Sequence, residues 1–209
     1  FNIDERMISN SGNIDLRDIE ICVLQGSSNL PDFFKSRIKD FIHGGGHLIL
    51  FPGSQSQSLP DISWLTQDFF ASPEATILEE GSFRQMNFSK LESQSFTEIF
   101  RNEDNRNVKL FQYIPIVPDQ NTRLMAGNNS SIWNRLQTGR GLIDIFGIAM
   151  DLKWTNFPLV GNYIPFWHML LYSSTNQLNE EILTVGEEWR LFHPEELLGK
   201  AVTHISPDN

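Results

Sequence analysis

The feature that most constrains this chain is an apolar segment, a helical segment and a second apolar segment that follow one another near its start. Residues 19–24 are short, apolar and rich in β-branched side chains, as in a buried strand of a parallel sheet. Pro31 and Asp32 favour a helix start, and the three glycines at 44–46 end that helix before a strand at 47–51. A strand, a helix of about 12 residues and a strand predict a βαβ unit, and therefore an α/β domain.

Further along the chain the apolar pattern is less regular and favours short strands. We expect strands at 75–79, 83–88, 108–114, 122–126, 131–137 and 141–149, a short helix at 60–70, a helical turn at 96–100 and a helix at 160–173. The tail has β character in three short runs. We therefore expect an α/β domain at 1–176 and a β-rich extension, the start of a second unit, at 177–209.

Composition narrows the classes of partner. The chain has 209 residues, of which 40% are hydrophobic, and this is enough for one sizeable core. Its net charge of -10 repels phosphate backbones, so we expect no nucleic-acid partner. No stretch approaches the roughly 20 apolar residues of a membrane span. Cys22 is the only cysteine, which excludes an intrachain disulfide and a cysteine metal cluster, and its apolar setting predicts a buried, inert thiol.

The two turns that follow the predicted strands of the βαβ unit are the most informative for function, because ligands of open α/β sheets lie beyond the carboxyl ends of the strands. A hydrolase of this architecture places its nucleophile on a tight strand-to-helix elbow. Pro52 stands at that point, with neither a nucleophilic atom nor a backbone N–H for an oxyanion hole. The sequence therefore predicts a domain that is not an enzyme.

Two alternatives stay open at these turns. One is a degenerate hydrolase that uses Ser54 as nucleophile with His47 or Asp151 as its base. The other is a small-ligand site in the crevice between the two turns. The residues predicted to contact such a ligand are Gly26, Ser27, Ser28, Gly53, Ser54 and Gln55.

The remaining polar candidates have simpler interpretations. The five histidines form none of the usual metal-ligand spacings, so no metal and no cofactor are expected. His43 and His47 flank the glycines at a helix end, where we expect capping or solvated roles. His168 falls in an apolar helix and is expected to be a hydrogen-bonded core or interface residue. Asp151 follows a strand and is expected to cap the next turn, with catalysis or metal binding as the alternative.

Three segments together resemble a known family. They are residues 18–53, the turn 138–141 (Thr-Gly-Arg-Gly) that leads into a strand, and residues 151–158 (Asp-Leu-Lys-Trp-Thr-Asn-Phe-Pro) with 163–166 (Tyr-Ile-Pro-Phe). They resemble the class I glutamine amidotransferase-like domain of BatA-type, aerotolerance-related bacterial membrane proteins. The third segment is similar to that family's D-x-x-W-[TS]-[DN]-[FL]-P signature and is the most specific match, with Asp151, Trp154 and Pro158 at its positions. The resemblance covers roughly residues 13–208.

The resemblance implies a flavodoxin-like, class I glutamine amidotransferase-like three-layer sandwich with a short C-terminal β-rich extension. It also implies an extracytoplasmic domain on the periplasmic face of a bacterial inner membrane, held by flanking membrane segments outside this chain and binding other envelope proteins. The amidotransferase fold normally carries a cysteine at the elbow, where Pro52 stands here, so the fold transfers and the activity does not.

Two further expectations concern the edge of the sheet, which the resemblance implies, and the aromatic residues. Such domains carry another strand and helix upstream, so a sheet without them has an exposed edge beside residues 19–24. The aromatic segments around Trp154, Tyr163, Phe166 and Trp167 offer a contact surface, with core packing as the competing role.

Overall fold

The computed structural model describes residues 15–26, 30–53, 59, 61–65, 71, 75–91, 94–100, 107–127 and 129–175. The helices are α1 (Asp32–His43), α2 (Gln94–Ile99) and α3 (Tyr163–Thr175), with a 3-10 turn η3 (Phe157–Leu159). The strands are β1 (Ile21–Gln25), β2 (His47–Phe51), β3 (Thr76–Ile77), β4 (Arg84–Asn87), β5 (Lys109–Leu110), β6 (Gln112–Tyr113), β7 (Thr122–Ala126), β8 (Ser130–Thr138) and β9 (Gly141–Phe146). The extension expected at 177–209 lies outside the described residues, so that domain boundary stays a prediction.

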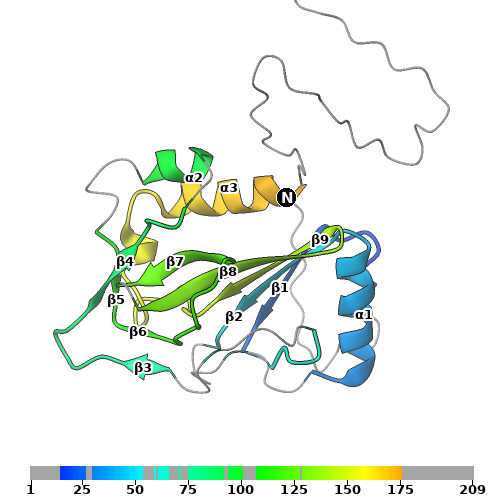
Figure 1. Ribbon diagram of the computed structural model, residues 1–209, viewed down its shortest axis with the longest axis horizontal. Coiled ribbons are helices and arrows are strands. Elements are labelled where there is room, and N and C mark those ends of the chain that lie inside the picture. The colour runs from blue at the N-terminus through cyan, green and yellow to red at the C-terminus, as the bar shows by residue number, and fades with distance from the viewer. Residues whose placement is uncertain are drawn as a thin grey trace, which may run out of the picture. The chain divides into compact units, whose positions relative to one another are not determined.

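Seven of these strands form one mixed sheet, in the order β1-β2-β9-β8-β7-β4-β5 (Figure 1). β1, β2 and β9 run parallel to one another, and the pairs from β9 through β8, β7 and β4 to β5 are antiparallel. β3 and β6 form a separate two-stranded sheet. Within the described residues β1 ends the strand order. Residues 1–14 lie outside the described residues, so the expected exposed edge stays a prediction.

The βαβ unit predicted from the sequence is confirmed. β1 and β2 pair in parallel, with Val23 opposite Ile49 and Gln25 opposite Phe51, and α1 connects them. α1 ends where the sequence indicates, because the backbone N–H of Gly44 bonds back to the carbonyl of Asp40.

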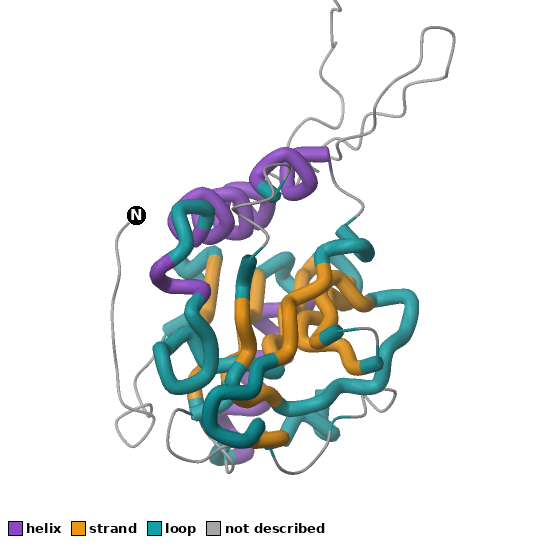
Figure 2. The backbone as a smooth tube through the Cα atoms, turned by 90° about the vertical axis from the view of Figure 1, so that its left-hand side faces the viewer, coloured by secondary structure: helices purple, strands orange, loops and turns teal. Residues whose placement is uncertain are grey.

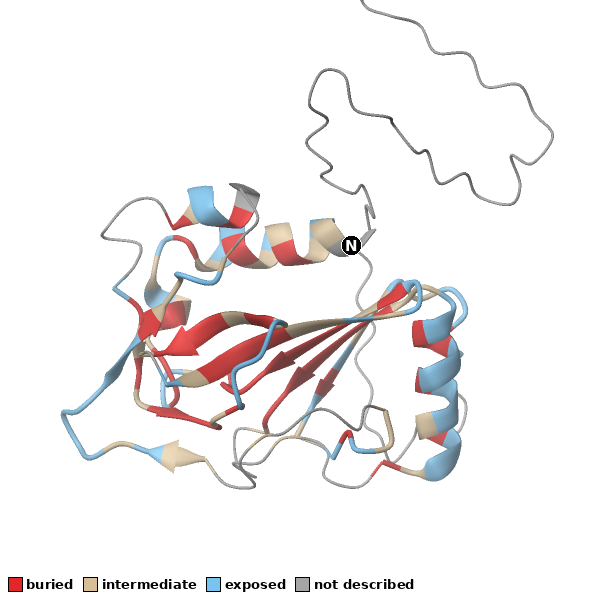
Figure 3. Ribbon diagram, in the orientation of Figure 1, coloured by how far each residue is buried: buried red, intermediate tan, exposed pale blue. Residues whose placement is uncertain are grey.

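Helices cover both faces of the sheet and enclose two cores (Figures 1 and 2). Side chains alternate along a strand, so Leu48 and Leu50 of β2 pack toward α1, while Ile49 and Phe51 pack on the face of α2 and α3. The core under α1 includes Phe34, Ile38, Phe41, Ile42, Ile143 and Ile145, and the core under α2 and α3 includes Trp133, Phe146, Trp154, Phe157, Phe166 and Leu170. The buried residues of β2 and β9 thus lie between two apolar layers (Figure 3).

The tip of the β8–β9 hairpin packs against the end of α1. Gly139 adopts a positive φ of 61°, which the two-residue turn between Thr138 and Gly141 requires. A Cβ on Gly141 would lie 2.2 Å from the carbonyl oxygen of Ile42, so only glycine fits there. Arg140 donates from Nη2 to the carbonyl of Gly44 at 3.1 Å. The glycine-rich turn is therefore a packing contact between hairpin and helix.

Two expected elements differ in the structure. Residues 61–65 form a turn instead of the start of a helix, because the carboxylate of Asp61 accepts the backbone N–H of Ser63 and its carbonyl accepts the indole N–H of Trp64. The single strand expected at 108–114 is broken into β5 and β6. Phe111 lies at the break, where its N–H bonds to the carbonyl of Trp154.

Candidate functional site

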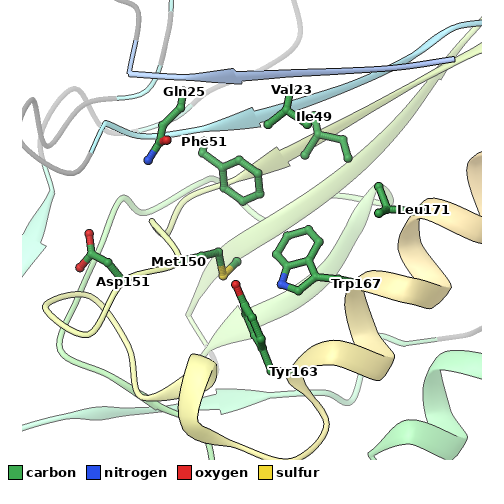
Figure 4. A pocket seen from close by; sticks show the side chains of 9 residues that line it. All are labelled: Val23, Gln25, Ile49, Phe51, Met150, Asp151, Tyr163, Trp167 and Leu171. Carbon is green, nitrogen blue, oxygen red and sulfur yellow. The ribbon is translucent and has the colours of Figure 1, made fainter. Parts of the chain in front are cut away.

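An open hollow of about 410 Å³ lies between α3 and the parallel edge of the sheet (Figure 4). Its volume falls within the range of about 300–1,000 Å³ that ligand pockets occupy. Its walls come from strands β1 and β2, from the segment after β9 and from one face of α3. The lining residues are Val23, Gln25, Ile49, Phe51, Met150, Asp151, Tyr163, Trp167 and Leu171.

Strand register builds the floor of the hollow. Val23 lies opposite Ile49 and Gln25 lies opposite Phe51, so these four side chains share the face of the sheet that α3 covers. Val23 remains 54% exposed although it is a β-branched residue in the middle of a strand. The hollow is therefore open beside β1.

Three aromatic rings stand around the hollow. The ring of Phe51 lies edge-on to the indole of Trp167, with centroids 5.6 Å apart and an interplanar angle of 63°. The ring of Tyr163 meets the same indole at 78°, with centroids 6.1 Å apart. Phe51 stacks with its other side on Phe146, which fixes its orientation. The rings thus form steeply inclined walls that packing holds in place.

Asp151 supplies the single carboxylate of the lining. Its Oδ1 accepts the backbone N–H of Lys153 at 2.9 Å, so the capping role expected from the sequence is confirmed. Its carboxylate forms no ion pair with any other described residue, and no basic side chain lines the hollow. The site is therefore apolar, with one negative charge at its rim.

The signature segment at 151–158 is held by hydrogen bonds to residues 109–111. Trp154 is fully buried, and its carbonyl accepts the N–H of Phe111 at 2.8 Å. Thr155 donates from Oγ1 to the carbonyl of Lys109, and Asn156 accepts the Lys109 N–H at 2.6 Å. These bonds tie the segment that follows β9 to β5, which positions Asp151 and the start of α3.

The members of the signature have different exposures. Pro158 lies in the first turn of η3, where a proline is compatible with the backbone. Trp154 and Phe166 are fully buried, so they contribute to the core. Tyr163 and Trp167 are partly buried and line the hollow, so among these aromatics they carry the accessible surface.

A second polar cluster lies buried on the same face of the sheet and is centred on Asp144. The carboxylate of Asp144 accepts two bonds from Arg135, at 2.9 and 2.8 Å, and one from the Trp133 indole at 2.7 Å. Its Oδ2 lies 2.7 Å from Nε2 of His47. Burial alone would raise the pKa of Asp144, but the Arg135 guanidinium and the hydrogen bonds hold this pKa well below its usual range.

This cluster corrects the interpretation of His47. The side chain is buried, 1% exposed, and pairs with Asp144, so the expected capping or solvated role is wrong. The position begins β2, whose backbone carries the side chain into the core. An ionised carboxylate only accepts hydrogen bonds, so Nε2 of His47 carries the proton. Its Nδ1 has no hydrogen-bond partner in the described part of the chain.

The same geometry argues against His47 as the base of a hydrolase. His47 begins β2 and Pro52 follows its end, so the two are separated by roughly 15 Å of strand. Asp144 already holds its imidazole. His168 is exposed on α3 and stacks on Tyr172, so the core role expected for it is wrong, while the interface role stays a prediction.

The predicted crevice residues fall partly within the described structure. Gly26 has a φ of 69° directly after β1, and its N–H bonds to the carbonyl of Phe51 at 3.1 Å, so the two strand ends lie side by side as expected. Gly53 follows β2 beyond the buried Pro52. Ser27, Ser28, Ser54 and Gln55 lie outside the described residues, and their role in ligand binding stays a prediction.

Sequence reasoning missed most of the lining. It named Asp151, Tyr163 and Trp167, but not Val23, Phe51 or Met150 as members of one site. No local signal identifies them, because their side chains meet only through the pairing of β1 with β2 and the return of α3. Asp144 had a signal: it is the only charged residue of the apolar strand 141–149 and lies on the strand that follows Arg135.

The described residues contain no group of three or more histidine, cysteine, aspartate or glutamate side chains placed to hold a metal ion. In the same residues, no helix has both the length and the apolar character needed to cross a bilayer.

Comparison with known proteins gives similarity at the level of fold. No family model matches the chain, and no curated protein matches it in sequence. The structure of the cytoplasmic protein STM1381 from Salmonella typhimurium LT2 matches with a TM-score of 0.54 and 14% identity, over 74% of this chain and 71% of that one. The domain therefore shares the fold of that protein.

Part of a glycosidase is also similar. The β-galactosidase of Rahnella sp. R3 matches with a TM-score of 0.50 and 10% identity, over 77% of this chain and 24% of the enzyme. The β-galactosidase of Bacillus circulans sp. alkalophilus matches at 0.45 and 11%, over 65% of this chain. This chain spans between a fifth and a quarter of these enzymes, 21% and 24% of their lengths.

Proposed function

We propose that this domain is a non-catalytic binding module that recognises a partner protein at the hollow between α3 and β1. The observation that carries the proposal is the composition of the hollow: fixed aromatic and aliphatic walls, an opening beside the exposed Val23, and a single carboxylate. Aromatic side chains held in a concave surface are typical of the anchoring points of protein interfaces.

The chemistry of the site supports a binding role over a catalytic one. General acid–base catalysis needs a side chain positioned to exchange a proton with the reacting group. The lining offers one carboxylate for this role, Asp151, and that carboxylate already accepts the backbone N–H of Lys153. Pro52 at the predicted elbow supplies no nucleophile. The histidine closest to that elbow in sequence, His47, is buried and bonded to Asp144. In the alternative of a hydrolase that uses Ser54 as nucleophile, His47 therefore does not serve as the base.

We further propose, from the resemblance given by residues 151–158, that the module belongs to a BatA-type envelope protein with an amidotransferase-like, flavodoxin-like sandwich fold. The parallel strands β1, β2 and β9, with helices on both faces of the sheet, support that proposal, whereas the antiparallel pairs from β9 to β5 depart from a flavodoxin-like sheet. The domain then lies on the periplasmic side of the inner membrane, where other envelope proteins are its partners. No reaction and no cofactor are assigned to it.

Photo-crosslinking in cells that carry the full-length gene product tests the binding role. A photoreactive phenylalanine analogue at position 23 is expected to give one discrete protein adduct. The same analogue at position 77, which is 61% exposed on β3 and outside the hollow, serves as the matched control. Equal adduct patterns at both positions contradict recognition at the hollow.

Protease treatment tests the location. External protease is expected to degrade the domain in spheroplasts and to leave it intact in whole cells, because the outer membrane then protects it. Full protection in spheroplasts places the domain inside the inner membrane and contradicts the envelope proposal.

A further inference from the structure

We propose that the hollow receives a basic side chain, the aliphatic stem and charged end of a lysine or arginine, presented by the partner protein. This inference rests on the proposed function and names the chemistry of the partner. It follows from three features of the lining: its sign of charge, its aromatic walls and its shape.

The charge of the lining favours a cation. Asp151 is the only charged residue among the nine that form the hollow, and it forms no ion pair with any described residue. Lys153 lies two positions away, but the contact between the two residues is a backbone bond, from the Lys153 N–H to the Asp151 carboxylate. An anionic group entering the hollow meets a carboxylate and no cation, so anions are disfavoured. The chain's net charge of -10 attracts a basic partner over longer distances.

The walls suit the rest of such a side chain. Phe51 and Tyr163 are inclined to the indole of Trp167 by 63° and 78°, and all three side chains line the hollow (Figure 4). Aromatic faces attract a cation within about 6 Å of the ring centroid. Val23, Ile49 and Leu171 provide aliphatic surface for the methylene stem.

The shape of the hollow points to a side chain carried by a protein. The hollow opens beside β1, the end strand of the described sheet, where Val23 is exposed. A polypeptide that runs along this edge reaches the hollow with one long side chain while its backbone stays outside. A volume of about 410 Å³ accommodates that side chain without rearrangement of the walls.

A peptide titration of the 209-residue chain, labelled with ¹⁵N, tests the inference. Three peptides identical except for a central lysine, norleucine or glutamate are compared, because norleucine keeps an aliphatic stem and lacks the charge. The lysine peptide is expected to shift the indole resonance of Trp167 and to bind about five-fold more tightly than the norleucine peptide. The glutamate peptide is expected to bind more weakly than both.

Matched variants assign the preference to one carboxylate. Asp151→Asn keeps an oxygen acceptor for the Lys153 N–H and removes the charge, so it is expected to reduce the difference between the lysine and norleucine peptides. Asp40→Asn, an exposed change on α1, is expected to leave that difference intact. Equal binding of lysine and norleucine peptides to the unmodified chain overturns the inference. So does a response to n-butylammonium chloride without any response to the lysine peptide.

The outcomes separate this inference from the proposed function. Cross-linking at position 23 that is insensitive to Asp151→Asn, together with no preference for lysine, overturns the basic side chain and leaves the binding module standing. Absence of a specific adduct at position 23 contradicts the binding module itself.

Discussion

Asp144 shows how much one buried residue organises in this domain. Asp144 lies on β9, and its two oxygens hold side chains from two other strands: His47 of β2, and Trp133 and Arg135 of β8. A buried carboxylate is tolerated only when it is paired and hydrogen-bonded, and here both oxygens are satisfied. The cluster therefore supports the register of β8 against β9 and holds the start of β2 beside β9.

Acid is expected to destabilise the fold through this residue. The pKa of Asp144 in the folded chain is below the value of about 3.9 expected after unfolding. The stabilisation that ionised Asp144 contributes to the fold is therefore fully present above about pH 4 and is lost as the pH falls toward the pKa of the folded chain. Asp144→Asn is expected to lower the free energy of unfolding by about 3–5 kcal/mol at pH 7, because Arg135 keeps a charge that loses its partner.

Urea unfolding between pH 7 and pH 3 measures both effects. The variant should show a shallower decline below pH 4 than the unmodified chain, since it lacks the titrating group. Asp40→Asn, on the exposed side of α1, should follow the unmodified chain. A variant at position 144 that matches the unmodified chain at pH 7 refutes the role given to the cluster.

Cys22 is expected to react slowly. Its side chain is partly buried against the core under α1, not fully buried as the sequence predicts. This desolvation raises the pKa of the thiol to about 11, so at pH 8 about one molecule in a thousand carries the reactive thiolate. Alkylation by iodoacetamide at pH 8 should be roughly 100-fold slower in the native chain than in denaturant, as followed by mass spectrometry. Equal rates in the two conditions would show that the thiol of the native chain is accessible and ionised, and would overturn the assignment of a shielded thiol.

At the scale of elements, close backbone contacts join parts that the sequence keeps far apart. The β8–β9 hairpin reaches the end of α1, where the N–H of Leu142 bonds to the carbonyl of Gly46. Arg140 adds a bond to the carbonyl of Gly44. The glycines at this junction permit an approach that a side chain would block, which gives the Thr-Gly-Arg-Gly turn a structural reason.

Substitution of Gly141 tests that junction. Gly141→Ala places a Cβ 2.2 Å from the carbonyl oxygen of Ile42, so backbone must move, and a loss of about 1–3 kcal/mol in the free energy of unfolding is expected. Gly161→Ala is the matched control, because no atom lies within 4 Å of the added Cβ. Urea unfolding of both variants checks this. A comparable loss at position 161 would show that the effect belongs to glycine removal in general.

The whole domain is organised around strands that serve two cores. Ile49 and Phe51 enter the core of α2 and α3, while Leu48 and Leu50 enter the core of α1. Each core packs on one face of β2, so loss of β2 from one core also removes the strand that the other core packs against. The two layers are therefore expected to unfold together.

Melting curves test this cooperativity. Far-ultraviolet and near-ultraviolet circular dichroism should report one coincident transition. Ile49→Ala and Leu50→Ala lie on opposite faces of β2. Each is expected to lower the free energy of unfolding by about 2–5 kcal/mol and to move the single transition to a lower temperature. Two separated transitions in either variant contradict a shared sheet as the source of cooperativity.

The amino-acid sequence by itself determined the elements whose signals are local. The strand, helix and strand at the start, the strands around the Thr-Gly-Arg-Gly turn and the helix expected at 160–173 all follow from periodicity and turn chemistry within a few residues. The capping role of Asp151 was also readable, because its hydrogen bond spans two positions.

Tertiary structure alone decided the rest. His47 and Asp144 are 97 positions apart, so no local pattern distinguishes the buried pair from a solvated histidine at a helix end. The strand expected at 108–114 is interrupted at Phe111, whose N–H bonds to the segment that follows β9. The hollow exists only because α3 returns over the ends of β1 and β2. Its walls and its negative charge come from side chains that are far apart in the sequence and meet only in the folded chain, so no local sequence pattern predicts them as one site.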